Sequence, residues 1–176
     1  DVCSSDLDFL NSDPDSPWLN KIKMANQESN DGSINQQSFV KSIKKYVLVA
    51  NNPITIQTAD KQHKIFLNYW KAITNILGIE EPTVLFKYNG VELFCKFSVP
   101  FFNKMINMPD FKVSTMQSLL EQAFEEVEGD YAGVGHTDFW TKGSTASFLN
   151  SGALNVINAE MVKALHKTNF QRDIEI

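Results

Sequence analysis

Arginine is nearly absent from this chain, which has a single arginine, Arg172, and 15 lysines among its 176 residues. Proteins favour arginine for bidentate contacts to phosphate and to guanine. The scarcity of arginine therefore argues against a surface dedicated to reading DNA bases. Lysine contacts phosphate as a point charge, so any contact with nucleic acid is expected to be independent of base sequence.

Cysteine and long apolar runs are also scarce. Cys3 and Cys95 do not have the spacing of a zinc site, and two cysteines do not make a disulfide scaffold. This usage fits a reducing compartment, and the predicted location is the cytoplasm. No apolar run approaches the roughly 20 residues of a membrane span, so no membrane partner is expected.

The three histidines give little support to metal binding or catalysis. His63, His136 and His166 fall on separate predicted elements, and none forms an H-x-x-x-H pair. A zinc site needs ligands that converge. Cys95 lies in an apolar run, where a buried thiol is the usual role. We therefore predict no metal, no cofactor and no catalytic residue, and favour a module that is not an enzyme.

The first 20 residues contain five aspartates and no lysine or arginine, a charge equal to the net charge of −5 of the whole chain. A signal peptide would need a positive start and an apolar run. Residues 11–17 and 29–32 are rich in turn residues, and Trp18 is a predicted anchor into the body. Because the chain opens at Asp1 without a methionine, we expect residues 1–32 to be an acidic, turn-rich lead-in from an upstream domain. Residues 33–176 are then expected to form a single helical domain.

Apolar residues recur at three- and four-residue spacing in several segments, the pattern of amphipathic helices. Helices are predicted from residue 33 to about 50, over about residues 59–77, from residue 114 to 128, and around residues 154–165. Ser33 with Gln36 and Ser114 with Gln117 are predicted capping boxes, in which the two side chains satisfy free amides at a helix start.

Residues 84–95 are compatible with two structures. Asn89-Gly90 between two apolar runs is a strong local signal for a two-residue β-hairpin turn. The apolar residues between Leu93 and Ile106 also fit a helix that bends or restarts near Pro100. The sequence thus predicts a mainly α fold, a compact bundle of about five to six helices, with a possible small β-hairpin at 84–95.

Lysine is concentrated in one part of the chain. Residues 31–112 hold ten lysines and six acidic residues, a local charge of +4. If the first two helices pack side by side, their lysines form a patch that faces phosphate. These candidate DNA-binding residues are Lys41, Lys44, Lys45, Lys61, Lys64 and Lys71. A solvated helix face is the alternative interpretation.

The glycine-bearing stretch 129–138 is a possible ligand loop. Gly133 and Gly135 can let backbone amides approach a phosphate, and His136 follows them directly. However, no strand precedes this stretch, no Gly-Lys-Ser/Thr follows it, and the helix before it is acidic. A plain connection between helices is therefore the alternative.

Several stretches in this order and spacing resemble the C-terminal region of DGQHR-domain proteins, the DndB/DpdB-like family associated with DNA modification. The stretches are Asp13-Pro14-Asp15-Ser16-Pro17-Trp18 running into residues 22–24, then residues 33–39, residues 66–73, and Phe139-Trp140 followed by Gly143 and Ser151-Gly152. They cover nearly the whole chain. The signature itself is absent: the nearest string, residues 60–64, has Lys61 where the signature has glycine.

The resemblance implies a helical region that follows a ParB/sulfiredoxin-like domain bearing the signature, and it favours helix over residues 90–107. The leading hypothesis is a non-catalytic C-terminal helical module of a larger DGQHR-type protein, linked to DNA modification or phage defence. Its expected partners are the upstream domain, DNA and a second copy of the chain. Two alternatives stay open: a structural or dimerisation module with no nucleic-acid role, and a nucleotide-processing enzyme fragment centred on His63 or on residues 133–136.

Overall fold

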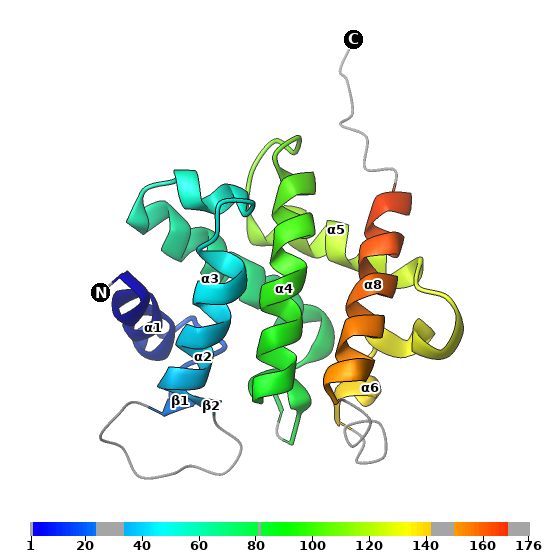
Figure 1. Ribbon diagram of the computed structural model, residues 1–176, viewed down its shortest axis with the longest axis horizontal. Coiled ribbons are helices and arrows are strands. Elements are labelled where there is room, and N and C mark those ends of the chain that lie inside the picture. The colour runs from blue at the N-terminus through cyan, green and yellow to red at the C-terminus, as the bar shows by residue number, and fades with distance from the viewer. Residues whose placement is uncertain (1, 24–33, 81, 142–149, 169–176) are drawn as a thin grey trace.

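Three helical segments lie side by side and form one layer of the molecule (Figure 1). They are α2 (Gln36–Ser42), which continues as the π-helix η1 (Ile43–Val47), α4 (Tyr88–Met105) and α8 (Ser151–Lys167). The computed structural model describes residues 2–23, 34–80, 82–141 and 150–168. Over these residues the chain is a mainly helical bundle, which confirms the predicted fold class.

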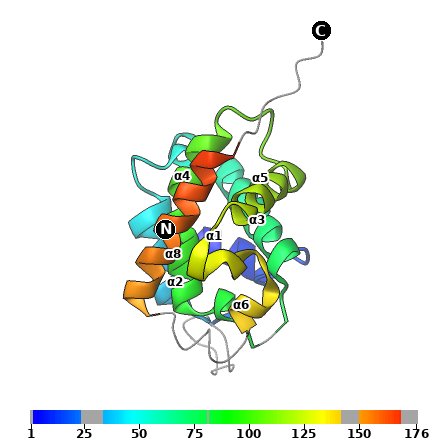
Figure 2. The same ribbon diagram turned by 90° about the vertical axis from the view of Figure 1, so that its right-hand side faces the viewer.

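A second layer lies behind the first, as the turned view shows (Figure 2). It contains α3 (Ala59–Leu77) and α5 (Val113–Glu125), which pack against each other, while α8 contacts both α4 and α5. The shorter elements are α1 (Val2–Ser12), η2 (Pro53–Ile56), η3 (Val84–Phe86), η4 (Gly129–Gly135) and α6 (Thr137–Thr141). The two short strands β1 (Ile22–Lys23) and β2 (Ile34–Asn35) form a parallel pair.

Aromatic side chains dominate the core between the layers. The ring of Trp18 makes edge-on contacts with the rings of Phe39, Trp70 and Phe86, at centroid distances of 4.8, 5.0 and 4.8 Å. All four side chains are fully buried. Such pairs add about 0.5–1.5 kcal/mol each to the free energy of burial. The predicted anchoring role of Trp18 is confirmed.

Residues 2–12 form helix α1, where the sequence predicts an acidic, turn-rich segment. Leu7 and Leu10 are buried and three residues apart, whereas Asp8 between them is exposed. The helix is stabilised by docking this short apolar stripe against α2 and α3. Turn structure is found further on, where the Asp13 carboxylate accepts a hydrogen bond from the Asp15 amide.

Two of the predicted helices are found close to their predicted positions. The helix predicted over about residues 59–77 is α3, whose buried residues include Tyr69, Trp70 and Ile73. It ends at Gly78, which has a φ of 85°, a left-handed conformation that favours glycine. The predicted final helix is α8.

The helix caps differ from the predicted capping boxes. Helix α2 begins at Gln36, and the side chain of Asn35 accepts a hydrogen bond from the Ser38 amide at 2.8 Å. Ser33 lies outside the described residues. Helix α5 begins at Val113, ahead of the predicted cap at Ser114. At α2 the capping role belongs to Asn35. The predicted box at Ser114 is wrong, because Lys112 is the N-cap residue of α5 and makes no side-chain capping hydrogen bond, while Asp110 accepts from the Lys112 amide at 2.9 Å just before the helix.

The possible hairpin at 84–95 is wrong, and the helical alternative is found. Residues 84–86 form η3, and α4 runs without interruption through Pro100. A Cβ on Gly90 would overlap the carbonyl oxygen of Val84 and lie 2.8 Å from the Cα of Leu85. The glycine of the Asn-Gly pair therefore permits the first turn of α4 to pack against the backbone of η3, and it does not supply a β-turn.

Candidate functional site

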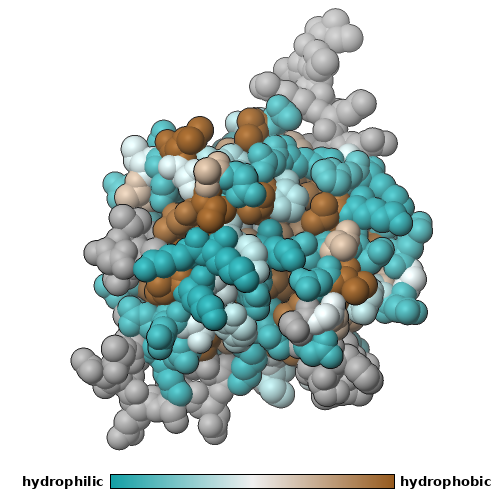
Figure 3. Space-filling model, viewed as in Figure 1, coloured by the Kyte–Doolittle hydropathy of each residue, from teal (hydrophilic) through white to brown (hydrophobic). Residues whose placement is uncertain are grey.

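Three of the predicted lysines share one face of a helix. Lys41, Lys44 and Lys45 stand at positions i, i+3 and i+4 of α2 and η1, and all three are exposed. The opposite side of the same segment is buried in the core through Phe39 and Val47. We call Lys41, Lys44 and Lys45 the lysine face. Figure 3 shows hydrophilic side chains gathered over α2 and η1 on this side of the molecule.

The other predicted lysines lie on α3. Lys61 and Lys64 are exposed in its first two turns, whereas Lys71 is half-buried about 10 Å further along the axis. The segment α2–η1 packs mainly against α4, and α3 packs mainly against α5. The two lysine-bearing helices meet at one end, where residues of η1 and of the first turns of α3 line a narrow cavity. The structure thus brings the lysines together as two groups, and Lys71 stands apart from both.

The neighbours of Lys45 raise the pKa of its ammonium group. A hydrogen bond with the Tyr46 hydroxyl is the main cause of a raised pKa for Lys45, and its Nζ lies 5.1 Å from the centroid of the Tyr46 ring. The Tyr46 hydroxyl in turn donates to Oε1 of Glu92 on α4, at 3.3 Å. The lysine face therefore connects through Tyr46 to a carboxylate on the neighbouring helix.

One glycine of the possible ligand loop, Gly135, has a packing role in η4. A Cβ on Gly135 would lie 2.8 Å from the Cβ of Phe124, so glycine is needed for close approach to α5. Trp140 is fully buried, and its indole nitrogen donates to the carbonyl oxygen of Val134 at 2.8 Å. A Cβ on Gly133 would make only an ordinary contact, 3.7 Å from the Phe139 ring. These contacts account for Gly135 without a ligand.

A pocket of about 340 Å³ adjoins this segment, between α3, α5 and η4. Gly135 and His136 line it together with Glu121 and Glu125 of α5. In the described part of the chain, these side chains belong to no group of histidine, cysteine or carboxylate residues that could hold a metal ion. A phosphate bound here would face the two carboxylates, so the electrostatics of this pocket oppose the phosphate-binding role predicted for the loop.

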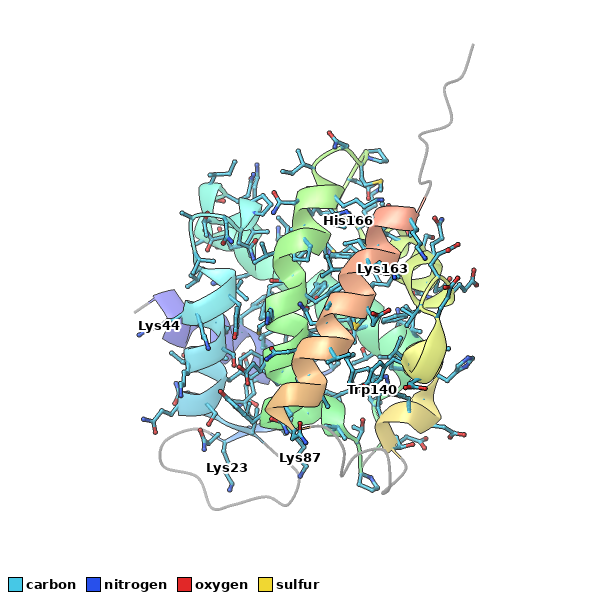
Figure 4. All side chains as sticks on the ribbon, turned by 45° about the vertical axis from the view of Figure 1, so that its right-hand side comes forward. Lys23, Lys44, Lys87, Trp140, Lys163 and His166 are labelled. Atoms are coloured by element: carbon cyan, nitrogen blue, oxygen red, sulfur yellow. The ribbon has the colours of Figure 1, made fainter. Side chains whose placement is uncertain are left out.

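The remaining histidines and Cys95 lie in different surroundings. His63 on α3 stacks on Phe9 of α1 with a centroid distance of 5.5 Å, and His166 is exposed near the end of α8 (Figure 4). Cys95 is a fully buried free thiol, and burial raises its pKa far above the ordinary value. A thiol that stays protonated is a poor nucleophile.

A second pocket, of about 360 Å³, lies between η1, α4 and α8, and we call it the η1–α4–α8 pocket. It is lined by Lys45, Tyr46, Glu92, Leu93, Lys96, Leu154 and Asn155. Nζ of Lys96 donates to Oδ1 of Asn155 at 3.0 Å and so joins α4 to α8. Sequence reasoning missed this site, because its residues come from three distant segments and only Lys45 belongs to a recognisable cluster.

Comparisons with protein-family models, with curated proteins and with solved structures gave no match to this chain. Among the described helices, none combines the length and the apolar character that crossing a membrane requires.

Proposed function

We propose that this chain is the non-catalytic C-terminal helical module of a larger DGQHR-type protein linked to DNA modification or phage defence. In this proposal it acts in the cytoplasm and contacts DNA through the lysine face. The observation that supports the DNA contact is the exposure of three ammonium groups on one side of a helix whose other side is buried. The core fixes the helix, so the charges are held on one surface before DNA arrives.

The chemistry of this surface suits the DNA backbone. Lysine neutralises phosphate charge and releases bound counterions, which makes affinity depend on salt and not on base sequence. The whole chain carries a net charge of −5, which repels DNA. In this proposal binding comes from the local positive charge of the lysine face, and removal of that charge is expected to abolish it.

The test compares two triple variants with the same change in charge. The first, Lys41→Glu/Lys44→Glu/Lys45→Glu, reverses the lysine face. The control, Lys87→Glu/Lys163→Glu/Lys167→Glu, reverses three exposed lysines elsewhere. Figure 4 shows that Lys44 and Lys163 lie on opposite sides of the helical layer and that Lys87 lies at one end of it.

Fluorescence anisotropy with a 20-base-pair duplex, read between 50 and 200 mM salt, measures the binding. The logarithm of the wild-type association constant is expected to fall linearly with the logarithm of the salt concentration. The slope is expected to be near −3 if three phosphates are contacted. The lysine-face variant is expected to lose binding while the control retains most of it. Equal loss in both variants, or an affinity that does not change with salt, would contradict the proposal. Thermal melts establish that both variants are folded.

A structural or dimerisation module is the second candidate, and exposed apolar residues favour it. Ile56 is 84% exposed and Ile106 is 56% exposed. The segments that carry them are joined by a hydrogen bond from the Asn103 side chain to the carbonyl oxygen of Asn51, at 3.1 Å. Sedimentation velocity over a hundredfold range of concentration tests self-association. A mass that rises with concentration, and falls back in Ile56→Ser/Ile106→Ser, would favour this candidate.

A further inference from the structure

The η1–α4–α8 pocket brings two ammonium groups to one site. Lys45 comes from η1 and Lys96 comes from α4. An ammonium group has three N–H donors, and Lys96 uses one of them to hold Asn155 of α8. The other donors of Lys96 are available to an anion. Two positive charges match the charge of a phosphate monoester, which is about −1.5 to −2 at neutral pH.

A carboxylate stands beside the two lysines. Glu92 accepts a hydrogen bond from the Tyr46 hydroxyl at 3.3 Å, and Tyr88 is also hydrogen-bonded to it. A carboxylate has about four acceptor positions, so Glu92 can accept further N–H or O–H donors from a ligand. It would also repel a second anionic group. The pocket thus favours a ligand with one phosphate and with separate hydrogen-bond donors.

The pocket is of the size of a small organic molecule, and its lining joins these polar groups to two leucines. Leu93 and Leu154 are buried and line it. A volume of about 360 Å³ lies within the range of small-molecule sites, which is about 300–1,000 Å³. A free phosphate ion would leave most of that space and the apolar lining unused.

The wall formed by η1 is fixed in place. The π-helical turn is closed by a hydrogen bond from the Leu48 amide to the Ile43 carbonyl oxygen, at 2.9 Å. The buried side chain of Asn52 donates to the carbonyl oxygen of Tyr46 at 3.2 Å and to Oγ of Ser98 on α4 at 3.0 Å. Such π-helical turns occur frequently at functional sites. Tyr46 and Lys45 are therefore held toward α4 before any ligand binds.

We propose that the η1–α4–α8 pocket binds a nucleoside 5′-monophosphate. The phosphate contacts Lys96 and Lys45, a base amino group or ribose hydroxyl donates to Glu92, and the base lies over Leu93 and Leu154. Nucleoside triphosphates bind less well, because their additional charge faces Glu92. This site does not require the DNA contact proposed above, although the two share Lys45.

Isothermal titration calorimetry on the full chain tests the proposal with AMP, GMP, CMP and UMP, and with adenosine, ATP and inorganic phosphate for comparison. At least one monophosphate is expected to bind with a dissociation constant below 1 mM. Its unphosphorylated nucleoside and inorganic phosphate are expected to bind at least about tenfold more weakly, because each lacks one set of charge-assisted or apolar contacts. Absence of binding by all four monophosphates at 10 mM would overturn the proposal, and so would inorganic phosphate that binds as tightly as they do.

Substitutions assign the binding to this pocket. Lys96→Met keeps the aliphatic stem and removes the charge, and it is expected to weaken monophosphate binding at least about tenfold. Lys163→Met is the matched control on α8 and is expected to leave the affinity unchanged. Glu92→Gln is expected to reduce the difference in affinity between nucleoside monophosphates and nucleoside triphosphates. An unchanged affinity in a folded Lys96→Met variant would place the nucleotide elsewhere and refute the assignment. Lys96 lies outside the lysine face, so Lys96→Met is expected to keep its affinity for DNA. The DNA affinity of this variant therefore distinguishes a failure of the nucleotide proposal from a failure of the DNA contact.

Discussion

Nδ2 of Asn52 lies 3.0 Å from Oγ of Ser98, and both side chains are fully buried. The same Nδ2 donates to the carbonyl oxygen of Tyr46, and Oδ1 of Asn52 accepts from the Ile54 amide at 3.3 Å. One buried amide therefore connects the π-helical turn, the segment that follows it and α4. This connection positions the wall of the η1–α4–α8 pocket.

Asn52→Ala is expected to lower the free energy of unfolding by about 1–3 kcal/mol, because it leaves buried polar partners without hydrogen bonds. Urea denaturation measures the change. Asn103→Ala is the control: its side chain also bonds to backbone oxygens, but it is exposed, so we expect a change below about 1 kcal/mol. Similar effects in the two variants would show that the buried network is not what stabilises this region.

Gly90→Ala is expected to destabilise the protein by about 1–3 kcal/mol, because the added Cβ would overlap the carbonyl oxygen of Val84. Backbone has to move to relieve this overlap, since no flexible side chain is involved. Chemical denaturation of Gly90→Ala and of Gly152→Ala, an exposed glycine in α8, provides the comparison. The control is expected to be neutral or stabilised by up to about 1 kcal/mol. A neutral Gly90→Ala would argue against the close packing of α4 on η3.

Gly133 and Gly135 are expected to respond differently to alanine. The Cβ of Gly135→Ala would meet Phe124 at 2.8 Å, whereas that of Gly133→Ala would make an ordinary contact with Phe139. We expect Gly135→Ala to lower the free energy of unfolding by about 1–3 kcal/mol and Gly133→Ala to change it by less than about 0.5 kcal/mol. Thermal melting measures both changes. Equal changes in stability at the two positions would contradict the packing explanation and favour a ligand-binding role for the segment.

The reactivity of Cys95 is expected to report on unfolding. Burial raises the pKa of this thiol above its ordinary value of 9.0, so it stays protonated in the folded protein. In a Cys3→Ser variant, Ellman's reagent at pH 8 is expected to react with Cys95 only after denaturation. Because the pKa of this thiol is higher in the folded protein than in the unfolded chain, its contribution to the free energy of unfolding is fully present below pH 9.0. The contribution declines above pH 9.0, where the unfolded chain loses the proton. Rapid reaction in the folded state would show that the thiol is accessible.

Local signals in the sequence predicted the structure correctly in segments that carry a single pattern. The apolar stripe of α3 and the glycine at its end predict the helix and its stop, because both depend on residues within a few turns of one another. The same local pattern predicts that Lys41, Lys44 and Lys45 are exposed, because the apolar residues of that segment occupy its buried side.

Tertiary contacts decided the segments where local signals were weak or in conflict. Residues 84–95 carry both a hairpin and a helix pattern, and the approach of α4 to the η3 backbone at Gly90 favours the helix. The acidic start of the chain became α1 because Leu7 and Leu10 could be buried against other helices. The sequence by itself thus determined a mainly helical chain and the exposure of lysines on its first predicted helix. The pocket that joins Lys45, Lys96 and Asn155 was decided by the packing of η1, α4 and α8, because the position of side chains from distant segments depends on how the helices dock and not on any local pattern.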